Sequence, residues 1–213
     1  MLHLWIRAEQ RKNEKRVAIT PQDVSKLINK SIRVTIEESS DRIIPTKEYH
    51  KVGCEIANQH AWPGAPQEAF ILGLKELPQN IERLEHRHIM FGHAFKGQTG
   101  GLELLKKFKA GKGILYDLEY LTDPEGRRLA AFGFWAGYAG AAVSLKAYAD
   151  QQNTKGICGP VSVFKNKEAM VNNVQNALSN VENKFPKILV VGAKGRVGSG
   201  AIDLCQSLGL SVT

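Results

Sequence analysis

The stretch that decides the fold is KILVVGAKGRVGSGA, which runs from Lys187 to Ala201. An apolar run comes first, a turn with a glycine at every third position follows, and the amphipathic segment AIDLCQSLG continues as a helix. This order of strand, glycine-rich turn and helix opens a dinucleotide-binding unit. Glycines permit the tight turn and let backbone N–H groups approach a pyrophosphate, and the helix N-terminus adds partial positive charge. The residues that we expect to bind the cofactor are Gly192, Gly195, Arg196, Val197 and Gly198.

The spacing of this turn differs from the strict G-x-G-x-x-G pattern by one inserted residue, so a purely structural turn is the alternative. In such units an acidic residue that binds the adenosine ribose follows about 20 residues later, here at or beyond Thr213. The local sequence therefore does not separate NAD from NADP. It also predicts that the chain stops within the second strand of this unit. We expect the unpaired strand edge to lower stability or to be completed by another chain.

The first two-thirds of the chain alternates strand-like and helix-like segments. Apolar or β-branched runs bounded by turn residues predict strands at 2–8, 32–39, 54–57, 69–76, 88–95 and 113–121. Helices are predicted at 21–30, with Thr20 as its N-cap, at 46–53 and at 99–111, with Gly111 as its stop, and again after residue 128 and at 167–183. This alternation is typical of an α/β fold with a largely parallel sheet.

We therefore predict an α/β fold with a Rossmann-like N-terminal domain and the start of a second, dinucleotide-binding Rossmann domain. The polar segment with glycine and proline that follows residue 150 predicts a connector. The expected boundaries are 1–150 for the N-terminal domain, 151–186 for a connector and linking helix, and 187–213 for the incomplete second domain.

Composition excludes several classes of protein. The net charge is +8, but the basic residues are dispersed and match no zinc finger, basic zipper or aromatic-interleaved RNA-binding pattern, so we expect no nucleic-acid partner. Such a charge also suits a site that handles anions. The N-terminus lacks the apolar core of a signal peptide, and three widely spaced cysteines predict free thiols in a reducing, cytoplasmic compartment.

Two further features favour a buried helix over a membrane span and argue against a metal site. The uncharged segment Leu129–Leu145 is borderline in length for a span and is rich in small residues, which favours a tightly packed buried helix. His86, His88 and His93 have no cysteine and no carboxylate triad nearby at ligand spacing, so we predict no metal.

Polar residues follow two successive apolar strands. Lys75 and Glu76 end the strand at 69–76, and His93 and Lys96 follow the next one. Open α/β sheets bind ligands at the carboxyl ends of their strands, and lysine and histidine are groups that transfer protons. The alternative is a solvated turn lysine and a hydrogen-bonded structural histidine. Arg16 and Arg128 are candidates for carboxylate binding, with surface solvation as their alternative.

Several blocks, in order, carry a resemblance to a known family. RAEQRKNEKRVAITP, LGLKELP, HIMFGHAFKGQ, LYDLEYL, GRRLAAFGFWAGYAGAA and VVGAKGRVGSGAIDL resemble the NAD-dependent, L-lysine-forming saccharopine dehydrogenases, which group with the alanine dehydrogenase/transhydrogenase-like enzymes. The resemblance implies two Rossmann-like domains with a site between them, NAD as cofactor, and oxidation of saccharopine to L-lysine and 2-oxoglutarate. It also implies a monomeric full-length enzyme of lysine biosynthesis that continues past residue 213.

The same resemblance implies roles for individual residues. Lys75 and His93 would form the acid–base pair, and Glu76 and Glu119 would tune the charge around them. The implied substrate-side residues are Arg16, Lys96, Arg128 and Phe132, with Arg11 nearby. Two alternatives stay open, namely a related amino- or oxo-acid dehydrogenase such as an alanine dehydrogenase-like enzyme, and a fragment that binds ligands without turnover.

Overall fold

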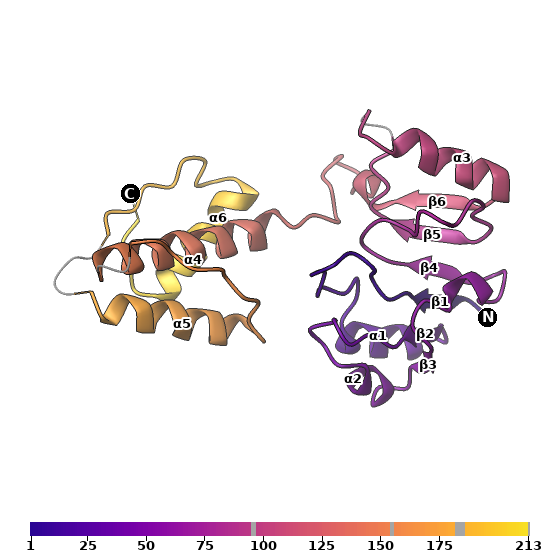
Figure 1. Cartoon of the computed structure of the whole chain (residues 1–213), viewed down its shortest axis with the longest axis horizontal. Coiled ribbons are helices and arrows are strands. Elements are labelled where there is room, and N and C mark those ends of the chain that lie inside the picture. The colour runs from indigo at the N-terminus through magenta and orange to yellow at the C-terminus, as the bar shows by residue number, and fades with distance from the viewer. Residues whose placement is uncertain (95–96, 154–155, 182–185, 213) are drawn as a thin grey trace. The chain divides into compact units, whose positions relative to one another are not determined.

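The structure, a computed structural model, describes residues 1–94, 97–153, 156–181 and 186–212. The chain divides into two compact units, Met1–Ala130 and Ala131–Thr213, which Figure 1 shows with their elements labelled. The boundary expected at residue 150 falls near the end of helix α4 (Gly133–Gln152). Because α4 packs on α5 (Lys167–Ser179) and α6 (Arg196–Ser207), the second unit begins before this helix.

The first unit is built on one six-stranded sheet in which every neighbouring pair is parallel. The strands are β1 (His3–Ile6), β2 (Arg33–Glu37), β3 (Glu55–Ala57), β4 (Phe70–Leu72), β5 (Arg87–Met90) and β6 (Ile114–Asp117). Their order is β3-β2-β1-β4-β5-β6, so the direction of strand addition reverses between β1 and β4. This is the order of a Rossmann fold, and the reversal marks where such sheets bind ligands. The predicted parallel α/β sheet is confirmed.

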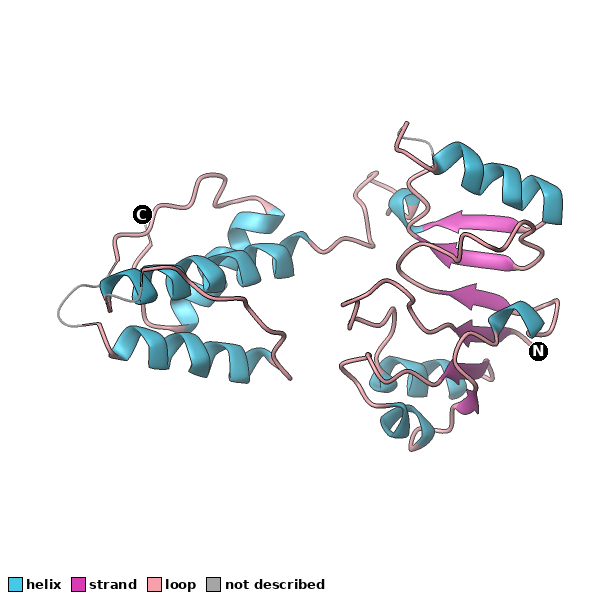
Figure 2. Cartoon of the chain, in the orientation of Figure 1, coloured by secondary structure: helices cyan, strands magenta, loops and turns pink. Residues whose placement is uncertain are grey.

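Helices and loops cover both faces of this sheet (Figure 2). The helices of the unit are α1 (Pro21–Ile28), α2 (Thr46–His50) and α3 (Gly101–Gly111), with the 3₁₀ turns η1 (Trp62–Gly64) and η2 (Leu118–Tyr120). Leu4 and Ile6 pack in one core with Val24 and Tyr49, whereas Trp5 between them packs against the other core, around Phe108 of α3. Successive strand side chains point to opposite faces, so the two cores lie on opposite sides of the sheet.

Of two predicted helix ends, the start of α1 is confirmed and the end of α3 is wrong by one residue. The Thr20 side chain accepts a hydrogen bond from the Asp23 amide at 3.3 Å and caps α1, as predicted. Gly111 does not stop α3, because the helix includes it and Lys112 takes the left-handed conformation instead, with φ 58°. A side chain at Gly111 would overlap the backbone of Leu84, so close approach is what requires this glycine.

His88 in β5 is a fully buried histidine of the first unit. Its ring contacts Trp62 at 5.1 Å and Phe108 at 5.4 Å between centroids, and neither ring nitrogen has a hydrogen-bond partner among the described residues. Burial lowers the pKa of His88 to about 3, so the imidazole is neutral in the folded chain.

This buried imidazole predicts acid sensitivity. Between pH 6.5 and 3 the unfolded chain binds a proton at His88 that the folded chain does not, so stability falls as pH falls, by about 1.4 kcal/mol per unit. Between pH 6.5 and pH 5 the free energy of unfolding falls in the wild type. We expect this fall to be smaller by about 2 kcal/mol in His88→Leu, measured by urea unfolding. The exposed His50→Gln variant is the control and keeps the wild-type slope. An unchanged slope in His88→Leu contradicts the prediction.

The described residues of the second unit form three packed helices, whose core includes Tyr138, Leu145, Val174 and Leu204. A side chain at Gly137 of α4 would overlap the Val197 carbonyl, so this small-residue helix is tightly packed, as predicted. Across the described ranges, no helix combines the length and apolar character that a bilayer crossing requires.

The prediction of a strand before the glycine turn is wrong for the described residues. Ile188 and Val212 form a single parallel bridge, and residues 187–191 form no strand. Leu189 and Val191 are 73% and 89% exposed, which shows apolar side chains without a packed neighbour. The physical reason is that a strand needs a paired partner along its length, and residues 211–212 supply one bridge only.

Candidate active site

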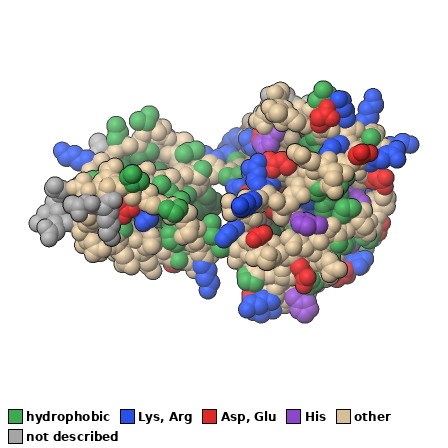
Figure 3. Space-filling model, in the orientation of Figure 1, with side chains coloured by type: hydrophobic (Ala, Val, Ile, Leu, Met, Phe, Trp, Pro, Cys, Tyr) green, Lys and Arg blue, Asp and Glu red, His purple; other side chains and the backbone are tan. Residues whose placement is uncertain are grey.

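The carboxyl ends of β1, β4, β5 and β6 lie along one edge of the parallel sheet, and a polar segment follows each of them. Arg7 to Arg16 follow β1, Lys75 and Glu76 follow β4, His93 follows β5 and Glu119 follows β6. In the space-filling view, basic and acidic side chains are interspersed over the first unit (Figure 3). Ion pairs within this edge therefore decide which charges remain available to a ligand.

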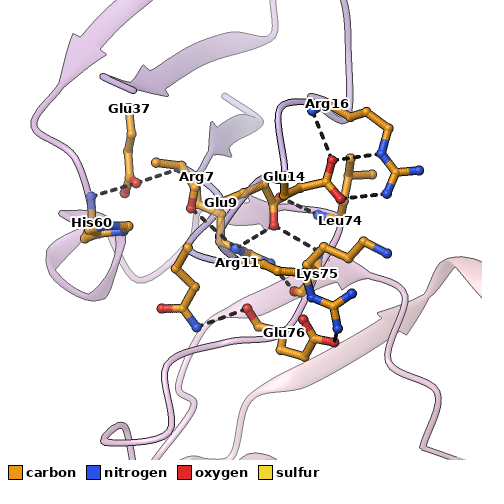
Figure 4. A network of polar contacts seen from close by, with 12 residues as sticks. Arg7, Glu9, Arg11, Glu14, Arg16, Glu37, His60, Leu74, Lys75 and Glu76 are labelled. Atoms are coloured by element: carbon orange, nitrogen blue, oxygen red, sulfur yellow. Dashed lines mark hydrogen bonds and ion pairs between the residues drawn. The ribbon is translucent and has the colours of Figure 1, made fainter. Parts of the chain in front are cut away.

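Two buried charged residues hold the backbone of Lys75 (Figure 4). Arg7 and Glu9 form an ion pair at 3.2 Å, with side chains only 1% and 7% exposed. The Glu9 carboxylate accepts hydrogen bonds from the amides of Leu74 at 2.6 Å and Lys75 at 3.0 Å, and Arg7 donates to the Lys75 carbonyl. Burial lowers the pKa of Arg7, and the carboxylates of Glu9 and Glu37 oppose this effect.

Gly73 is required by this arrangement, because a side chain there would overlap the Arg7 guanidinium. Arg7 has little room to move since Glu9 and the Lys75 carbonyl hold it. We expect Gly73→Ala to lower the free energy of unfolding by about 2 kcal/mol, measured by urea denaturation. Gly64→Ala is the matched control, because Gly64 has open space around it, and its expected change is below about 0.5 kcal/mol. Equal effects of the two substitutions contradict this prediction.

A second carboxylate near Lys75 is paired with a predicted substrate-binding residue. Glu14 accepts hydrogen bonds from Arg16 Nε at 2.8 Å and Arg16 Nη2 at 2.6 Å, a bidentate contact. These hydrogen bonds lower the pKa of Glu14 and raise that of Arg16, and the positive charge of Lys75 also lowers the pKa of Glu14. Arg16 therefore already holds a carboxylate, that of Glu14, in this structure.

Glu76 lies at the more exposed side of the same network. It forms an ion pair with Arg11, and the two side chains are 60% and 53% exposed. Its backbone carbonyl accepts a hydrogen bond from Gln10 at 3.3 Å. Solvent screens such exposed pairs, so this one leaves Glu76 able to exchange partners.

The carboxyl ends of β5 and β6 form a second polar group. Glu119 Oε1 lies 3.4 Å from His93 Nδ1 and 3.4 Å from Arg128 Nη2, and its side chain is 7% exposed. The contact with His93 meets the distance of an ion pair but not the geometry of a hydrogen bond. Asp117 Oδ1 accepts hydrogen bonds from the amides of Gly92 at 3.1 Å and Glu119 at 3.0 Å, so it joins the two strand ends.

The backbone of His93 is itself unusual. Its φ is 52°, a left-handed value that an L-residue other than glycine rarely adopts. Such conformations cost of order 1–3 kcal/mol and persist where the surroundings hold them, often at functional sites. The ring also stacks on Phe91, with 6.4 Å between centroids and an interplanar angle of 23°. His93 is therefore held in a defined orientation at the edge of the sheet.

The predicted site residues fall into groups in the structure. Lys75, Glu76, Arg11 and Arg16 belong to one polar network, and His93, Glu119 and Arg128 belong to the next, both at the same sheet edge. Phe132 lies in the second unit, at the N-cap of α4 and 44% exposed. Lys96 lies outside the described residues. No group of three or more His, Cys, Asp or Glu suited to a metal is found within the described ranges.

Sequence reasoning missed the carboxylates that organise this edge. They are Glu9, Glu14, Glu37 and Asp117. Glu37 is fully buried at the end of β2 and accepts four N–H hydrogen bonds, and Arg42 donates to its backbone carbonyl. One signal was present in the sequence, because a carboxylate at or just after an apolar strand is a candidate for binding neighbouring backbone amides.

The glycine turn of the second unit has the features of a phosphate-binding loop. Gly192 has φ 79°, Gly195 is the N-cap of α6, and the helix start carries no side-chain cap. A side chain at Gly198 would overlap the Gly192 carbonyl, so the helix lies close against the turn. Arg196 and Val197 are exposed in the first turn of α6. The backbone N–H groups in the first turn of α6 are therefore candidates for binding a phosphate group.

Residues 5–139 match the family described as Alanine dehydrogenase/PNT, N-terminal domain. The chain belongs to this family. Over 98% of its length it is 43% identical to a protein of Schizosaccharomyces pombe named saccharopine dehydrogenase [NAD(+), L-lysine-forming], and over 97% it is 42% identical to one of Candida albicans with the same name. The chain spans 58% of the length of each of these relatives.

More distant relatives of this family share parts of the chain or its fold. A bovine mitochondrial alpha-aminoadipic semialdehyde synthase is 32% identical over 60% of the chain, which covers 13% of that protein. A transhydrogenase from Sinorhizobium meliloti has a TM-score of 0.63 at 20% identity, with 99% of this chain and 57% of that chain covered. An L-alanine dehydrogenase gives a TM-score of 0.62 at 16% identity. The two solved structures support the Rossmann-like fold.

Proposed function

We propose that the protein is an NAD-dependent, L-lysine-forming saccharopine dehydrogenase, which converts saccharopine to L-lysine and 2-oxoglutarate and catalyses the reverse reaction. The observation that carries this proposal is the placement of Lys75 and His93 at the ends of adjacent strands, β4 and β5. Each follows a glycine that lies just past its strand, and a carboxylate binds the backbone there, that of Glu9 at the Lys75 amide and that of Asp117 at the Gly92 amide. The 43% identity to an enzyme of this name supports the choice of substrate.

Lys75 is the residue proposed to remove the proton from the secondary amine of saccharopine. It is half-buried, and its side-chain nitrogen, which takes that proton as the neutral amine, makes no hydrogen bond or ion pair with a residue that the structure describes. The hydride that leaves the carbon next to that nitrogen would go to NAD, which would supply the hydride acceptor when bound. Arg7 and Glu9 fix the Lys75 backbone, so the side chain starts from a set position.

His93 is the residue proposed to act on the imine that results. As a base its imidazole takes a proton from the water that attacks the imine carbon. It then returns that proton to the nitrogen and, as the C–N bond breaks, takes the proton that remains on the new hydroxyl. The amine of L-lysine leaves and the carbonyl of 2-oxoglutarate forms. Glu119, at 3.4 Å from Nδ1, stabilises the protonated ring between these two transfers.

Arg16 and Arg128 are proposed to bind substrate carboxylates. Both are partly exposed, at 50% and 38%, and each is already paired with a carboxylate of the chain. When a substrate carboxylate binds, it therefore displaces Glu14 from Arg16 or Glu119 from Arg128, or binds the same arginine beside that glutamate. Saccharopine carries several carboxylates, which fits an edge where arginines lie beside exchangeable partners.

The glycine turn and the N-terminus of α6 are proposed to bind the pyrophosphate of NAD, through Gly192, Gly195, Arg196, Val197 and Gly198. The absence of a side-chain cap leaves the N–H groups of the first turn available for phosphate oxygens. Calorimetric titration with NAD and with NADP tests cofactor binding without requiring turnover. Micromolar binding of NAD supports this part of the proposal, and no binding of either nucleotide contradicts it for this chain.

The test of the activity is to incubate the protein with NAD and saccharopine and to follow NADH by absorbance. Because the chain spans 58% of its relatives, the assay is run on this chain and on any longer product of the same gene. A signal with saccharopine supports the proposal. A longer product that is inactive on saccharopine but active on alanine or another amino acid points to a related dehydrogenase and overturns the assignment.

We also propose that the enzyme acts as a monomer in the cytoplasm. Cys54, Cys158 and Cys205 are free thiols, and Cys54 and Cys205 are buried, as a reducing compartment favours. Burial raises the pKa of Cys54 to about 11, which keeps this thiol protonated and unreactive. Sedimentation velocity of the active form tests the monomer, and localisation of a tagged protein tests the compartment.

A further inference from the structure

We infer that Glu9, supported by Arg7, is a positioning residue that sets the backbone from which Lys75 works. This inference rests on the proposed function, because it needs Lys75 to be the group that transfers a proton. Glu9 acts through Lys75 rather than on the substrate.

The first argument is where the β-ladder stops. β1 pairs with β4 through Ile6 and Leu72, the Arg7 amide donates to the Leu72 carbonyl at 3.0 Å, and the Gly73 amide donates to the Ile89 carbonyl at 3.0 Å. Beyond Gly73 the hydrogen-bond partners of the chain change from strands to side chains. The next two amides donate to Glu9, and the Lys75 carbonyl accepts from Arg7. The backbone on both sides of the Lys75 Cα is therefore fixed by one ion pair.

The second argument is that both carboxylate oxygens of Glu9 accept hydrogen bonds in these contacts. Oε1 accepts from the Leu74 amide, and Oε2 accepts from both the Lys75 amide and Arg7. The side chain is 7% exposed. A carboxylate so placed has little surface for a ligand, and burial strengthens its hydrogen bonds by lowering the local dielectric.

The third argument is that the surrounding residues are shaped to keep this pair in place. Gly73 leaves space for the Arg7 guanidinium, as described above. On the other side, the Ala8 amide between the two charged residues donates to Glu37 at 2.8 Å, so the segment that carries them is anchored to β2. Contacts other than those with Lys75 therefore hold Arg7 and Glu9 at the sheet edge.

The experiment compares Glu9→Gln with the wild type in the form of the protein that turns over saccharopine. Gln keeps the shape but loses the charge and one acceptor oxygen, so Lys75 is displaced while the substrate-binding arginines stay in place. We expect kcat to fall about 10- to 100-fold and KM for saccharopine to change less than about threefold. Glu103→Gln, on the exposed face of α3, is the matched control and keeps wild-type kinetics.

A double-mutant cycle separates positioning from general destabilisation. In the Lys75→Ala background, Glu9→Gln lowers the residual activity by less than about twofold if Glu9 acts through Lys75. The same 10- to 100-fold loss in both backgrounds overturns the inference. If Glu9→Gln does not fold, Arg7→Lys replaces it, because lysine keeps the charge but does not bind Glu9 and the Lys75 carbonyl together. We then expect a kcat loss of about three- to tenfold, and an unchanged kcat overturns the inference.

Amide hydrogen exchange supplies a measurement that does not depend on turnover. We expect the amides of Leu74 and Lys75 to exchange at least about tenfold faster in Glu9→Gln, while the Ile6 and Ile36 amides exchange as in the wild type. Unchanged exchange at Leu74 and Lys75 overturns the positioning whatever the activity. A wild-type protein that is inactive on every substrate tested instead overturns the proposed function, and with it the catalytic part of this inference.

Discussion

Replacing Lys75 by alanine is expected to lower the turnover of saccharopine by about 10²- to 10⁴-fold, the usual contribution of a general acid–base group. Lys75 follows β4 at the sheet edge, is half-buried, and has a backbone held by Arg7 and Glu9. Removing its amine leaves no group in that place to take the proton from the substrate nitrogen. The loss should appear in kcat, because the arginines proposed to bind the carboxylates are unchanged.

Chemical rescue distinguishes the loss of a base from damage to the fold. Ethylamine added to Lys75→Ala should restore part of the activity in proportion to its concentration, since a small amine fits the space that the side chain leaves. Lys109→Ala, an exposed lysine of α3, is the control and keeps wild-type activity with no response to the amine. A loss of less than about threefold in Lys75→Ala, with NADH still formed, would remove Lys75 from the proposed mechanism.

Much of the first unit was predictable, because each of its strands is a short apolar or β-branched run bounded by turn residues. The positions of Lys75 and His93 at strand ends were also predictable, since each lies just past such a run. Their carboxylate partners were not. Glu9 binds amides that follow β4, and Asp117 binds one that follows β5, and these pairings depend on a strand order that local patterns do not contain.

Two other expectations depended on neighbours that a local pattern does not reveal. The binding of a substrate carboxylate by Arg16 stays a prediction, and in the structure its guanidinium binds the carboxylate of Glu14 two residues earlier. The apolar run before the glycine turn was predicted as a strand, yet Leu189 is 73% exposed, because within the described residues a single bridge, from Ile188 to Val212, forms beside it. Propensity predicts a segment's preference, and the available partners decide whether the preference is realised.

Glu37→Gln is expected to cost about 3–5 kcal/mol in the free energy of unfolding, the largest stability effect that this edge predicts. Glu37 is fully buried, and each carboxylate oxygen accepts two hydrogen bonds. Oε1 accepts from the Trp5 indole at 3.0 Å and the Trp62 amide at 2.6 Å, and Oε2 accepts from the amides of Ala8 at 2.8 Å and His60 at 2.9 Å.

Gln has the same shape but only one acceptor oxygen. Whichever way its amide is turned, an NH₂ group faces two N–H donors, and those donors are buried with no acceptor. His60 adds to the cost, because its φ of 61° is a strained left-handed value that the hydrogen bond to Glu37 helps to hold. Typical domains are stable by about 5–15 kcal/mol, so a loss of this size removes a large share of the total.

Urea unfolding followed by tryptophan fluorescence measures this loss, because Trp5 and Trp62 both bind Glu37 and report on its surroundings. Glu38→Gln is the matched control, since Glu38 is the next residue but exposed, and its expected change is below about 0.5 kcal/mol. A loss of less than about 1 kcal/mol in Glu37→Gln would show that the four donors find other acceptors. The anchor of Ala8, and through it the placement of Arg7 and Glu9 beside Lys75, would then not depend on this carboxylate.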